Sequence, residues 1–333
     1  MATAPRIGID LLGSDTPPEK LFHAVIECFS KIELPAKFVV FGTKNLFLHI
    51  KAPPEITCIP VSEFISMEDS PLVAVRRKKN SSLCVGIEML KKVELDAFIT
   101  AGNTGALLAC CKLELPMLPG IDRPALMTLI PTKKEPIAVL DVGANVSVKA
   151  EHLVQFASMG IAYQKTRGIE RPTVGLLNIG SEKKKGTPEI RKAYEHLQQQ
   201  LNRTTPLSSP IFIGNVEGRD VFHGEIDVLI TDGFSGNIFL KTAEGLAEFI
   251  LDDLQKAGAF EGSLELKNII STLWNRLRYD EYPGAILCGV EGIVMKCHGR
   301  PSASSLVNSI KCAIRLSQHF FLEKIKQELR PTN

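Results

Sequence analysis

The sequence lacks the cysteine and histidine spacings that mark metal sites and disulfide frameworks. Its eight cysteines include no Cys-x-x-Cys pair and lie mostly in apolar stretches, which indicates buried, reduced thiols. Its seven histidines include no His-x-x-x-His or His-Glu-x-x-His pattern, so zinc hydrolysis is not indicated. We therefore expect neither a bound metal nor a cofactor.

Long apolar runs and a strong net charge are also missing. The longest uncharged stretch, Ala97–Cys111, contains polar residues and is too short to span about 30 Å of hydrocarbon. The net charge of +2 gives no general attraction for nucleic acid. Because the amino terminus has no basic segment followed by a long apolar one, we expect a cytoplasmic protein that neither spans a membrane nor binds nucleic acid.

Three common catalytic motifs are absent as well. Gly180–Thr187 resembles a P-loop, but five residues separate its glycines and no lysine follows Gly186. Gly233–Asn237 differs from the Gly-x-Ser-x-Gly nucleophile elbow at its last position. No Gly-x-Gly-x-x-Gly follows the first strand pattern. These absences disfavour nucleotide kinases, serine hydrolases and dinucleotide-dependent dehydrogenases.

Short apolar runs alternate with helical patterns along the chain. The runs that favour strands are Arg6–Leu12, Lys37–Phe41, Asp96–Thr100, Pro136–Asp141, Thr173–Asn178, Ile211–Gly214, Asp227–Thr231 and Gly292–Cys297. The clearest helical patterns are Pro71–Val93, Ala150–Tyr163, Pro188–Leu201, Phe239–Ala257 and Ser304–Leu329. This alternation predicts an α/β fold with a doubly wound, mainly parallel sheet. We expect one domain over residues 1–333 with a helical insertion at 251–282; two lobes are the alternative.

The exits of these strands are rich in glycine and in small polar residues. They are Gly13–Asp15, Gly102–Gly105, Asp141–Asn145, Gly180–Glu182, Gly214–Glu217 and Asp232–Asn237. Glycine lets backbone N–H groups approach a ligand, and Asn, Asp, Ser and Thr cap helices. Each exit alone is typical of an ordinary turn. Because all follow strands of one predicted sheet, we expect them to share a polar site, with an anion near the basic loop that ends at Gly186.

A series of short blocks is the most specific signal in the chain. The blocks are Arg76–Ser82, Ala101–Ala106, Gly120–Ala125, Leu140–Val146, Gly175–Gly180, Phe212–Glu217 and Thr231–Asn237. In this order, from about Ile7 to His298, they closely resemble the PlsX family of bacterial phosphate acyltransferases. The chain departs from the family at Leu11–Asp15, where Ala-Met-Gly-Gly-Asp is usual, and at Lys183, where an acidic residue is usual.

The resemblance implies transfer of a fatty acyl group from acyl carrier protein to inorganic phosphate, which forms acyl phosphate for phospholipid synthesis. It implies a three-layer α-β-α fold similar to those of isocitrate dehydrogenase and phosphotransacetylase. It also implies a homodimer that associates peripherally with the membrane, either with the lipid surface or with a membrane glycerol-3-phosphate acyltransferase.

Attack of phosphate on a thioester needs positioned reactants and a stabilised oxyanion. Positioning removes about 7–11 kcal/mol of barrier, and one oxyanion donor contributes roughly 3–4 kcal/mol. Lys185 matches the catalytic lysine of the family and is expected to stabilise phosphate and transition-state charge. Asn237 matches the catalytic asparagine and is expected to hold the thioester carbonyl. Without the resemblance, a solvated lysine and an ordinary helix cap are the alternatives.

Further polar residues at the strand exits are candidates for substrate binding. Asp232 is expected either to orient neighbouring donors or to cap its own turn. The remaining candidates are Asn103, Thr104, Asn145, Asn178 and Asn215. We expect fewer than half of them to contact substrate.

Two segments are candidate partner surfaces. Arg76, Arg77, Lys78 and Lys79 are consecutive cations that suit an acidic acyl carrier protein, although a solvated helix face is equally expected. In the segment 264–282, the apolar residues Ile270, Leu273, Trp274 and Leu277 recur at helical spacing. Such a helix suits a membrane surface, as the resemblance implies, while core or dimer packing is the alternative.

Two rival functions stay open. One is a phosphotransacetylase-like enzyme that uses acyl-CoA, which differs from the leading hypothesis in its acyl donor. The other is a noncatalytic membrane scaffold on the same fold. A scaffold has no need of Lys185 and Asn237, and this chain has both.

Overall fold

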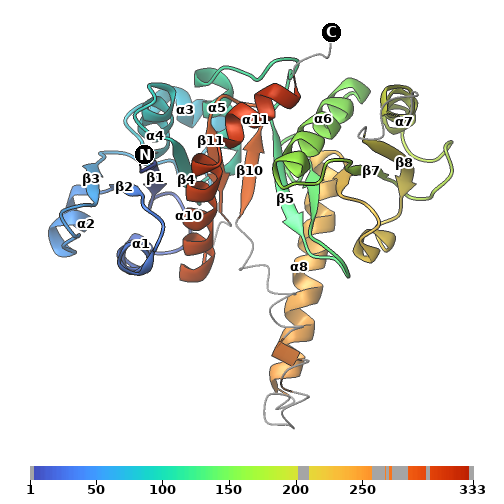
Figure 1. The fold of residues 1–333 in the computed structure, drawn as a ribbon. Coiled ribbons are helices and arrows are strands. Elements are labelled where there is room, and N and C mark those ends of the chain that lie inside the picture. The colour runs from blue at the N-terminus through green and yellow to red at the C-terminus, as the bar shows by residue number, and fades with distance from the viewer. Residues whose placement is uncertain are drawn as a thin grey trace. The chain divides into compact units, whose positions relative to one another are not determined.

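The chain forms two compact units in a computed structural model that describes residues 4–201, 210–256, 267, 270, 271, 284–297 and 301–329. Unit 1 comprises Met1–Leu126 and Pro283–Asn333, and unit 2 comprises Met127–Tyr282 (Figure 1). The single domain expected from the sequence stays a prediction.

Unit 1 contains a sheet in the order β3-β2-β1-β4-β11-β10. The strands are β1 (Arg6–Asp10), β2 (Lys37–Gly42), β3 (Thr57–Pro60), β4 (Ala97–Thr100), β10 (Ala285–Cys288) and β11 (Ile293–Lys296). All pairings are parallel except that of β10 with β11. The carboxyl ends of β1, β4 and β11 therefore meet at one edge.

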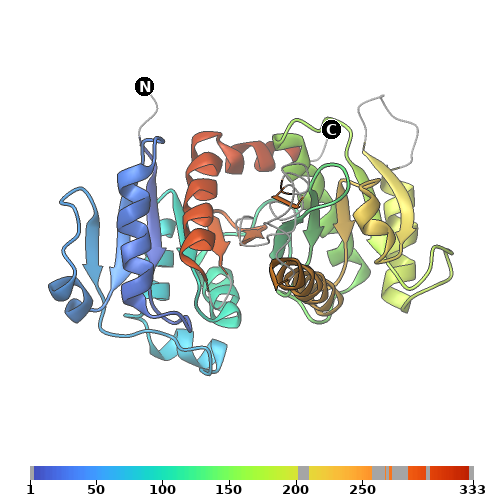
Figure 2. The same ribbon diagram turned by 90° about the horizontal axis from the view of Figure 1, so that it is seen from below.

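Helices cover both faces of the unit 1 sheet. They are α1 (Pro18–Lys31), α2 (Lys44–His49), α3 (Pro71–Arg77), α4 (Ser82–Lys91), α5 (Thr104–Glu114), α10 (Ala303–Gln318) and α11 (Phe321–Glu328). Figure 2 shows α1 and α10 side by side in front of the strands, while Figure 1 shows α4 and α5 beyond the other face. The opposite placement follows from right-handed crossovers that lead from β1 to β2 and back from β3 to β4.

Within unit 2 the strands follow the order β5-β6-β9-β7-β8. Its strands are β5 (Ala125–Ile130), which begins at the unit boundary, β6 (Ile137–Leu140), β7 (Thr173–Leu177), β8 (Ile211–Val216) and β9 (Val228–Ile230). Only the β5–β6 pairing is antiparallel. Helices α6 (Ala150–Thr166) and α7 (Pro188–Leu201) cover one side, and α8 (Gly233–Lys256) lies on the other (Figure 1). The 3-10 helix η1 spans Asp220–His223.

These strand orders confirm the predicted α/β class with a mainly parallel sheet and helices on both sides, but several element boundaries were wrong. The single helix predicted at 71–93 is α3 and α4, because Lys78 leaves helical geometry and the Ser81 hydroxyl caps α4 by accepting from the Cys84 N–H at 3.4 Å. The helix predicted at 304–329 is divided at Phe320, which has a φ of 53°. The elements β3, β5, β10, α1, α2 and α5 were not predicted.

The predicted membrane tip lies largely outside the described residues. Leu273, Trp274 and Leu277 are not among them, whereas Ile270 is and its side chain is buried. Within the part of the chain that the structure describes, no helix has the length and apolar character needed to cross a bilayer.

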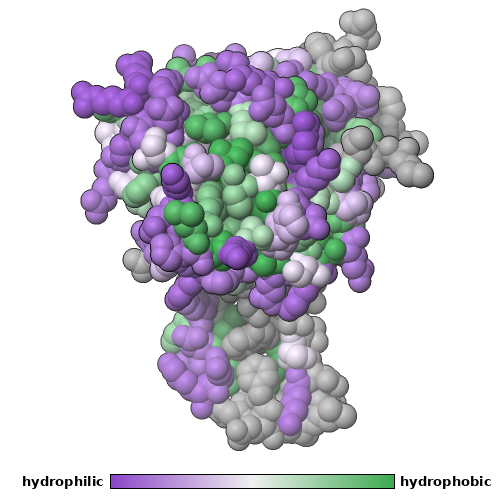
Figure 3. All heavy atoms as spheres, turned by 90° about the vertical axis from the view of Figure 1, so that its left-hand side faces the viewer, coloured by the Kyte–Doolittle hydropathy of each residue, from purple (hydrophilic) through white to green (hydrophobic). Residues whose placement is uncertain are grey.

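The edge of unit 1 that carries α2 and β3 has an apolar centre. Figure 3 shows apolar side chains gathered there and rimmed by polar ones. Leu48 of α2 is the most exposed large apolar residue of that helix, at 71%. The edge strand β3 has only four residues and ends in Pro60, a combination that limits strand-to-strand association.

A buried carboxylate links three strands of unit 1. Asp10, at the end of β1, accepts hydrogen bonds from the Leu12 N–H at 3.0 Å and from the Thr100 hydroxyl at 2.8 Å. Burial raises its pKa to about 6, against the opposing effects of these bonds, of Ser82 and of the Lys296 ammonium. Lys296 is itself buried and donates to the carbonyl oxygens of Ala101 and Cys297.

The raised pKa of Asp10 predicts a pH-dependent loss of stability. Between pH about 4 and about 6 the unfolded chain releases this proton while the folded chain retains it, so the free energy of unfolding falls as pH rises. The loss amounts to about 3 kcal/mol. Urea unfolding of wild type and Asp10→Asn at several pH values should show it as a difference between the two curves, and a difference that does not change with pH contradicts the prediction.

Candidate functional site

The loops that follow four parallel strands gather at one edge of unit 2. The strands β6, β9, β7 and β8 are neighbours in that order, so their carboxyl ends lie side by side. Lys185 follows β7 and Asn237 follows β9, which places the two predicted catalytic residues on the exits of adjacent strands. The prediction that Gly214–Glu217 forms a strand exit was wrong in one respect, because Gly214 and Asn215 lie within β8.

Asp141 organises the first of these loops. It is fully buried at the end of β6, and its carboxylate accepts from the N–H groups of Gly143, Ala144 and Asn145 at 3.2, 2.9 and 2.7 Å. The amide of Asn145 adds a fourth bond at 2.9 Å. Asn145 therefore helps to fold the loop. We did not select Asp141 as a site residue, although it lies within the block Leu140–Val146.

The start of α8 docks directly on this loop. The Gly233 N–H donates to the Asn145 carbonyl at 2.8 Å, and a Cβ at Gly236 would lie 1.9 Å from the Asp141 carbonyl oxygen. Only glycine permits this close approach. One residue later, the exposed Asn237 side chain lies over Gly143, with its Cγ 3.7 Å from where a Cβ would stand. An amide is thus held beside a turn whose φ of 135° requires glycine.

Asp232 caps α8, which is the simpler of the two roles predicted for it. Its carboxylate accepts from the Ser235 N–H at 2.8 Å and from the Ser235 hydroxyl at 3.0 Å. Consequently α8 begins at Gly233 and not at the predicted Phe239. Asn237 lies inside the helix, so its alternative role as the cap is wrong.

Two asparagines hold the loop that carries Lys185. Asn178 is buried at the end of β7, and its amide donates to the Lys185 carbonyl at 3.2 Å. Asn215 of β8 donates to the Glu182 carbonyl at 2.9 Å. Gly186 closes the loop with a φ of 85°, where a Cβ would lie 2.7 Å from Asn178 Oδ1. Both asparagines, which were expected to bind substrate, therefore bond the loop backbone. The buried Asn215 Oδ1 has no hydrogen-bond partner among the described residues.

Two of the three consecutive lysines of this loop, Lys183 and Lys185, have different surroundings. Lys183 Nζ lies 5.6 Å from the centre of the Tyr194 ring and within 3.5 Å of Gln198 on α7. The Lys185 methylenes lie over Gly180, and its Nζ is 3.9 Å from a Glu182 carboxylate oxygen. Because 49% of the Lys185 side chain is exposed, this ion pair is weak and leaves the ammonium accessible to an anion.

Two further candidates, Asn103 and Thr104, belong to unit 1. Asn103 caps α5 by accepting from the Ala106 N–H, and its amide donates to the carbonyls of Ser66, Met67 and Asp69 at 3.1–3.2 Å. Both its amide nitrogen and its amide oxygen are engaged in holding the structure. Thr104 is the first residue of α5 and is half-buried.

The four consecutive cations of unit 1 differ in their ion pairing. Lys78 pairs with Asp69 at 2.5 Å, and Lys79 lies 3.7 Å from Glu114. Arg76 and Arg77 are exposed in the last turn of α3 and form no ion pair with any residue that the structure describes.

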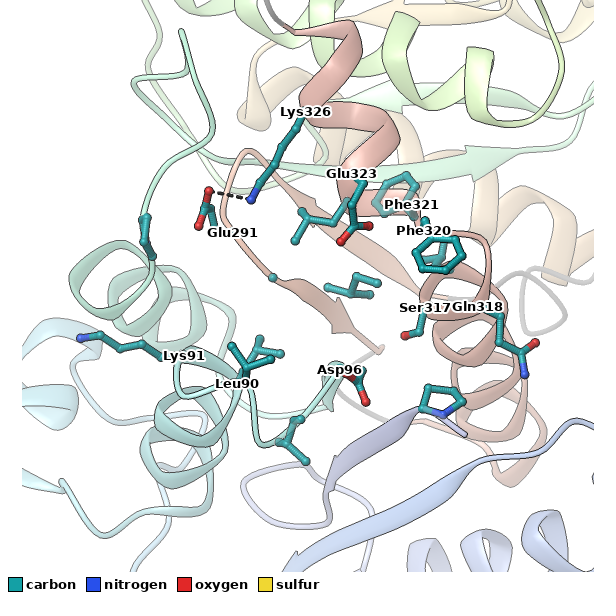
Figure 4. Close-up of a pocket in the computed structure, with 18 residues that line it drawn as sticks. Leu90, Lys91, Asp96, Glu291, Ser317, Gln318, Phe320, Phe321, Glu323 and Lys326 are labelled. Carbon is teal, nitrogen blue, oxygen red and sulfur yellow. Dashed lines mark ion pairs between the residues drawn. The ribbon is translucent and has the colours of Figure 1, made fainter. Parts of the chain in front are cut away.

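Unit 1 contains a cavity of about 520 Å³. It opens in unit 1 at the amino-terminal ends of strands, beside Pro5, Asp96 and Gly292. Figure 4 shows Lys326 paired across it with Glu291, at 2.7 Å. Its lining shares no residue with the predicted site. Among the described residues, no group of three or more His, Cys, Asp or Glu side chains is arranged to hold a metal ion.

Comparison with known proteins identifies the family. The sequence model described as "Fatty acid synthesis protein" matches residues 5–324. The phosphate acyltransferase of Chlamydia pneumoniae is 39% identical, over 97% of this chain and 99% of the relative. The phosphate acyltransferase of Thermoanaerobacter pseudethanolicus is 39% identical over 97% of both chains. The chain belongs to the fatty acid synthesis protein family. This confirms the resemblance to PlsX proteins, and the chain is an acyltransferase.

Solved structures confirm the fold. A phosphotransacetylase from Streptococcus pyogenes has a TM-score of 0.63 at 16% identity, covering 95% of this chain and 94% of that one. EutD phosphotransacetylase from Staphylococcus aureus has a TM-score of 0.61 with the same identity and coverage. At such identities the likeness concerns the α/β fold alone.

The contact between Gly236 and Asp141 predicts opposite effects for two glycine substitutions in α8. Gly236→Ala drives a methyl group into the Asp141 carbonyl and should lower the free energy of unfolding by about 1–3 kcal/mol. Gly245→Ala, where a Cβ meets nothing within 4 Å, should raise it by about 0.5–1 kcal/mol through helix propensity. Urea unfolding measures both, and equal stabilities contradict the docking of α8 on the loop.

Proposed function

We propose that the enzyme transfers a fatty acyl group from acyl carrier protein to inorganic phosphate, yielding the acyl phosphate used in phospholipid synthesis. The observation that carries the proposal is the placement of Lys185 and Asn237 on adjacent strand exits, each exposed on a backbone fixed by buried side chains. Family membership supports acyl transfer to phosphate in general. The carrier-protein donor and the lipid pathway rest on the sequence resemblance.

The proposed reaction needs no covalent enzyme intermediate. A phosphate oxygen attacks the thioester carbonyl carbon, and the C–S bond breaks to release the carrier thiolate. We assign phosphate and developing charge to the Lys185 ammonium, and the carbonyl oxygen to the Asn237 amide. The backbone that carries each group is held in place before substrate arrives, which supports a site in which little rearrangement opposes the reaction.

Release of free acyl carrier protein from palmitoyl-acyl carrier protein tests this reaction. Release should require inorganic phosphate, and Lys185→Ala and Asn237→Ala should each lower kcat by about 10²–10³ because each removes one charge-stabilising group. Lys192→Ala, whose lysine pairs with Glu151 on the outer surface of α6 and α7, is the control. Full activity in either folded site variant refutes the assignment.

The donor distinguishes the proposal from its rivals. Phosphate-dependent turnover of palmitoyl-CoA without turnover of the carrier-bound substrate favours the phosphotransacetylase-like alternative. A folded protein that turns over neither substrate favours a noncatalytic scaffold.

A homodimer and peripheral membrane association are part of the proposal. Helix α8 supports both, since it exposes a series of apolar side chains at helical spacing. They are Phe234, Ile238, Leu246, Phe249 and Ile250. Such a stripe on a 24-residue helix suits a second copy or a lipid surface.

Trp274→Glu separates lipid contact from dimer packing. We expect the variant to lose most of its co-sedimentation with phospholipid vesicles while it remains dimeric in sedimentation equilibrium, since a charge opposes insertion of the predicted amphipathic segment into the membrane interface. Unchanged co-sedimentation of a folded variant dimer contradicts a lipid-facing role for Trp274.

A further inference from the structure

One surface of unit 1 combines exposed apolar side chains with exposed cations. It consists of the loop Glu63–Ser70 and the helix α3 that follows. The exposed apolar side chains on it are Phe64, Met67, Leu72 and Val73, at 48, 38, 45 and 47% exposure. Exposed aromatic, Met and Arg side chains are typical of protein interfaces.

Buried and half-buried groups hold the loop of this surface in place. The Asn103 amide donates to three of its carbonyls, and the Lys78 ammonium pairs with Asp69 and donates to the Phe64 carbonyl at 3.1 Å. The Ser82 N–H donates to the Glu63 carbonyl at 3.3 Å. The loop is therefore ordered before any partner arrives, which lowers the entropy lost on binding.

The outward face of α3 joins apolar and cationic side chains. Leu72 and Arg76 are four residues apart, as are Val73 and Arg77, so the four side chains share one face, while Ala74 and Val75 are buried. The arginines have no ion-pair partner among the described residues. The loop also carries three carboxylates, of which Asp69 is paired with Lys78, Glu63 is half-buried and Glu68 is exposed.

We propose that this surface docks an acidic helical protein, which presents an apolar patch to Phe64, Met67, Leu72 and Val73 and carboxylates to Arg76 and Arg77. The charge of the free arginines selects an acidic partner, and guanidinium groups bind carboxylates with two parallel hydrogen bonds. Under the proposed function, on which this identification rests, the partner is the acyl carrier protein. Asn103 and Lys78 are then positioning residues of the docking loop.

The test measures binding of holo-acyl carrier protein, without an acyl group, by fluorescence anisotropy. Arg76→Glu with Arg77→Glu should weaken binding at least tenfold, and more strongly at low salt than at high salt. Lys20→Glu with Lys324→Glu makes the same charge change on α1 and α11 and should leave binding unchanged. Affinities that fall equally in both double variants, or in neither, overturn the proposal.

A second variant tests the apolar part of the surface. Phe64→Ala with Val73→Ala removes exposed side chains, so the fold should survive, as a thermal unfolding curve can verify. It should weaken carrier binding at least tenfold at every salt concentration. Wild-type affinity in this variant overturns the apolar part of the proposal.

Turnover with two donors separates this proposal from the proposed reaction. With phosphate present, the arginine variant should lose at least tenfold more kcat/KM for palmitoyl-acyl carrier protein than for palmitoyl-pantetheine, which lacks the protein. Equal losses overturn the docking surface. If wild type binds the carrier through the arginines but transfers no acyl group, the reaction fails while the docking surface stands.

Discussion

The buried carboxylate of Asp141 is the interaction on which the candidate site depends. In a site from which water is excluded, four N–H donors around one carboxylate fix a loop far more firmly than exposed contacts do. The loop then offers its Asn145 carbonyl to Gly233 and its Asp141 carbonyl to the glycine face of α8. The position of Asn237 is a consequence of these contacts.

The Lys185 loop is built by the same principle with different side chains. Here amides replace the carboxylate, and Asn178 and Asn215 hold the backbone from two neighbouring strands. In both loops the polar groups nearest the core bond to the backbone, and the residues proposed for chemistry are the exposed ones. This division suits catalysis, since a preorganised exposed group needs little rearrangement when substrate binds.

In unit 1 the same division between residues that hold the backbone and exposed residues occurs at the surface that we propose binds a partner protein. The Asn103 amide nitrogen fixes a loop while its oxygen caps α5, and Lys78 is engaged by Asp69. Arg76 and Arg77 remain outward. Within this run of four cations, Lys78 therefore serves the structure, and Arg76 and Arg77 are available for recognition. The order of these residues in the sequence does not show which of them has which role.

The sequence alone determined the fold class, the family and most of the strand-exit loops, because apolar periodicity and glycine-rich blocks are local properties. It also predicted α7 at its observed bounds. Tertiary structure decided the rest. Asn103, Asn145, Asn178 and Asn215 looked like substrate ligands because an amide that binds a ligand and one that binds a backbone carbonyl have the same local sequence. Likewise, the start of α8 depends on Asp232 finding Ser235 and on two glycines meeting a loop about ninety residues away in sequence. Which partner a polar side chain meets is set by the packing of distant strands, and no local pattern contains that information.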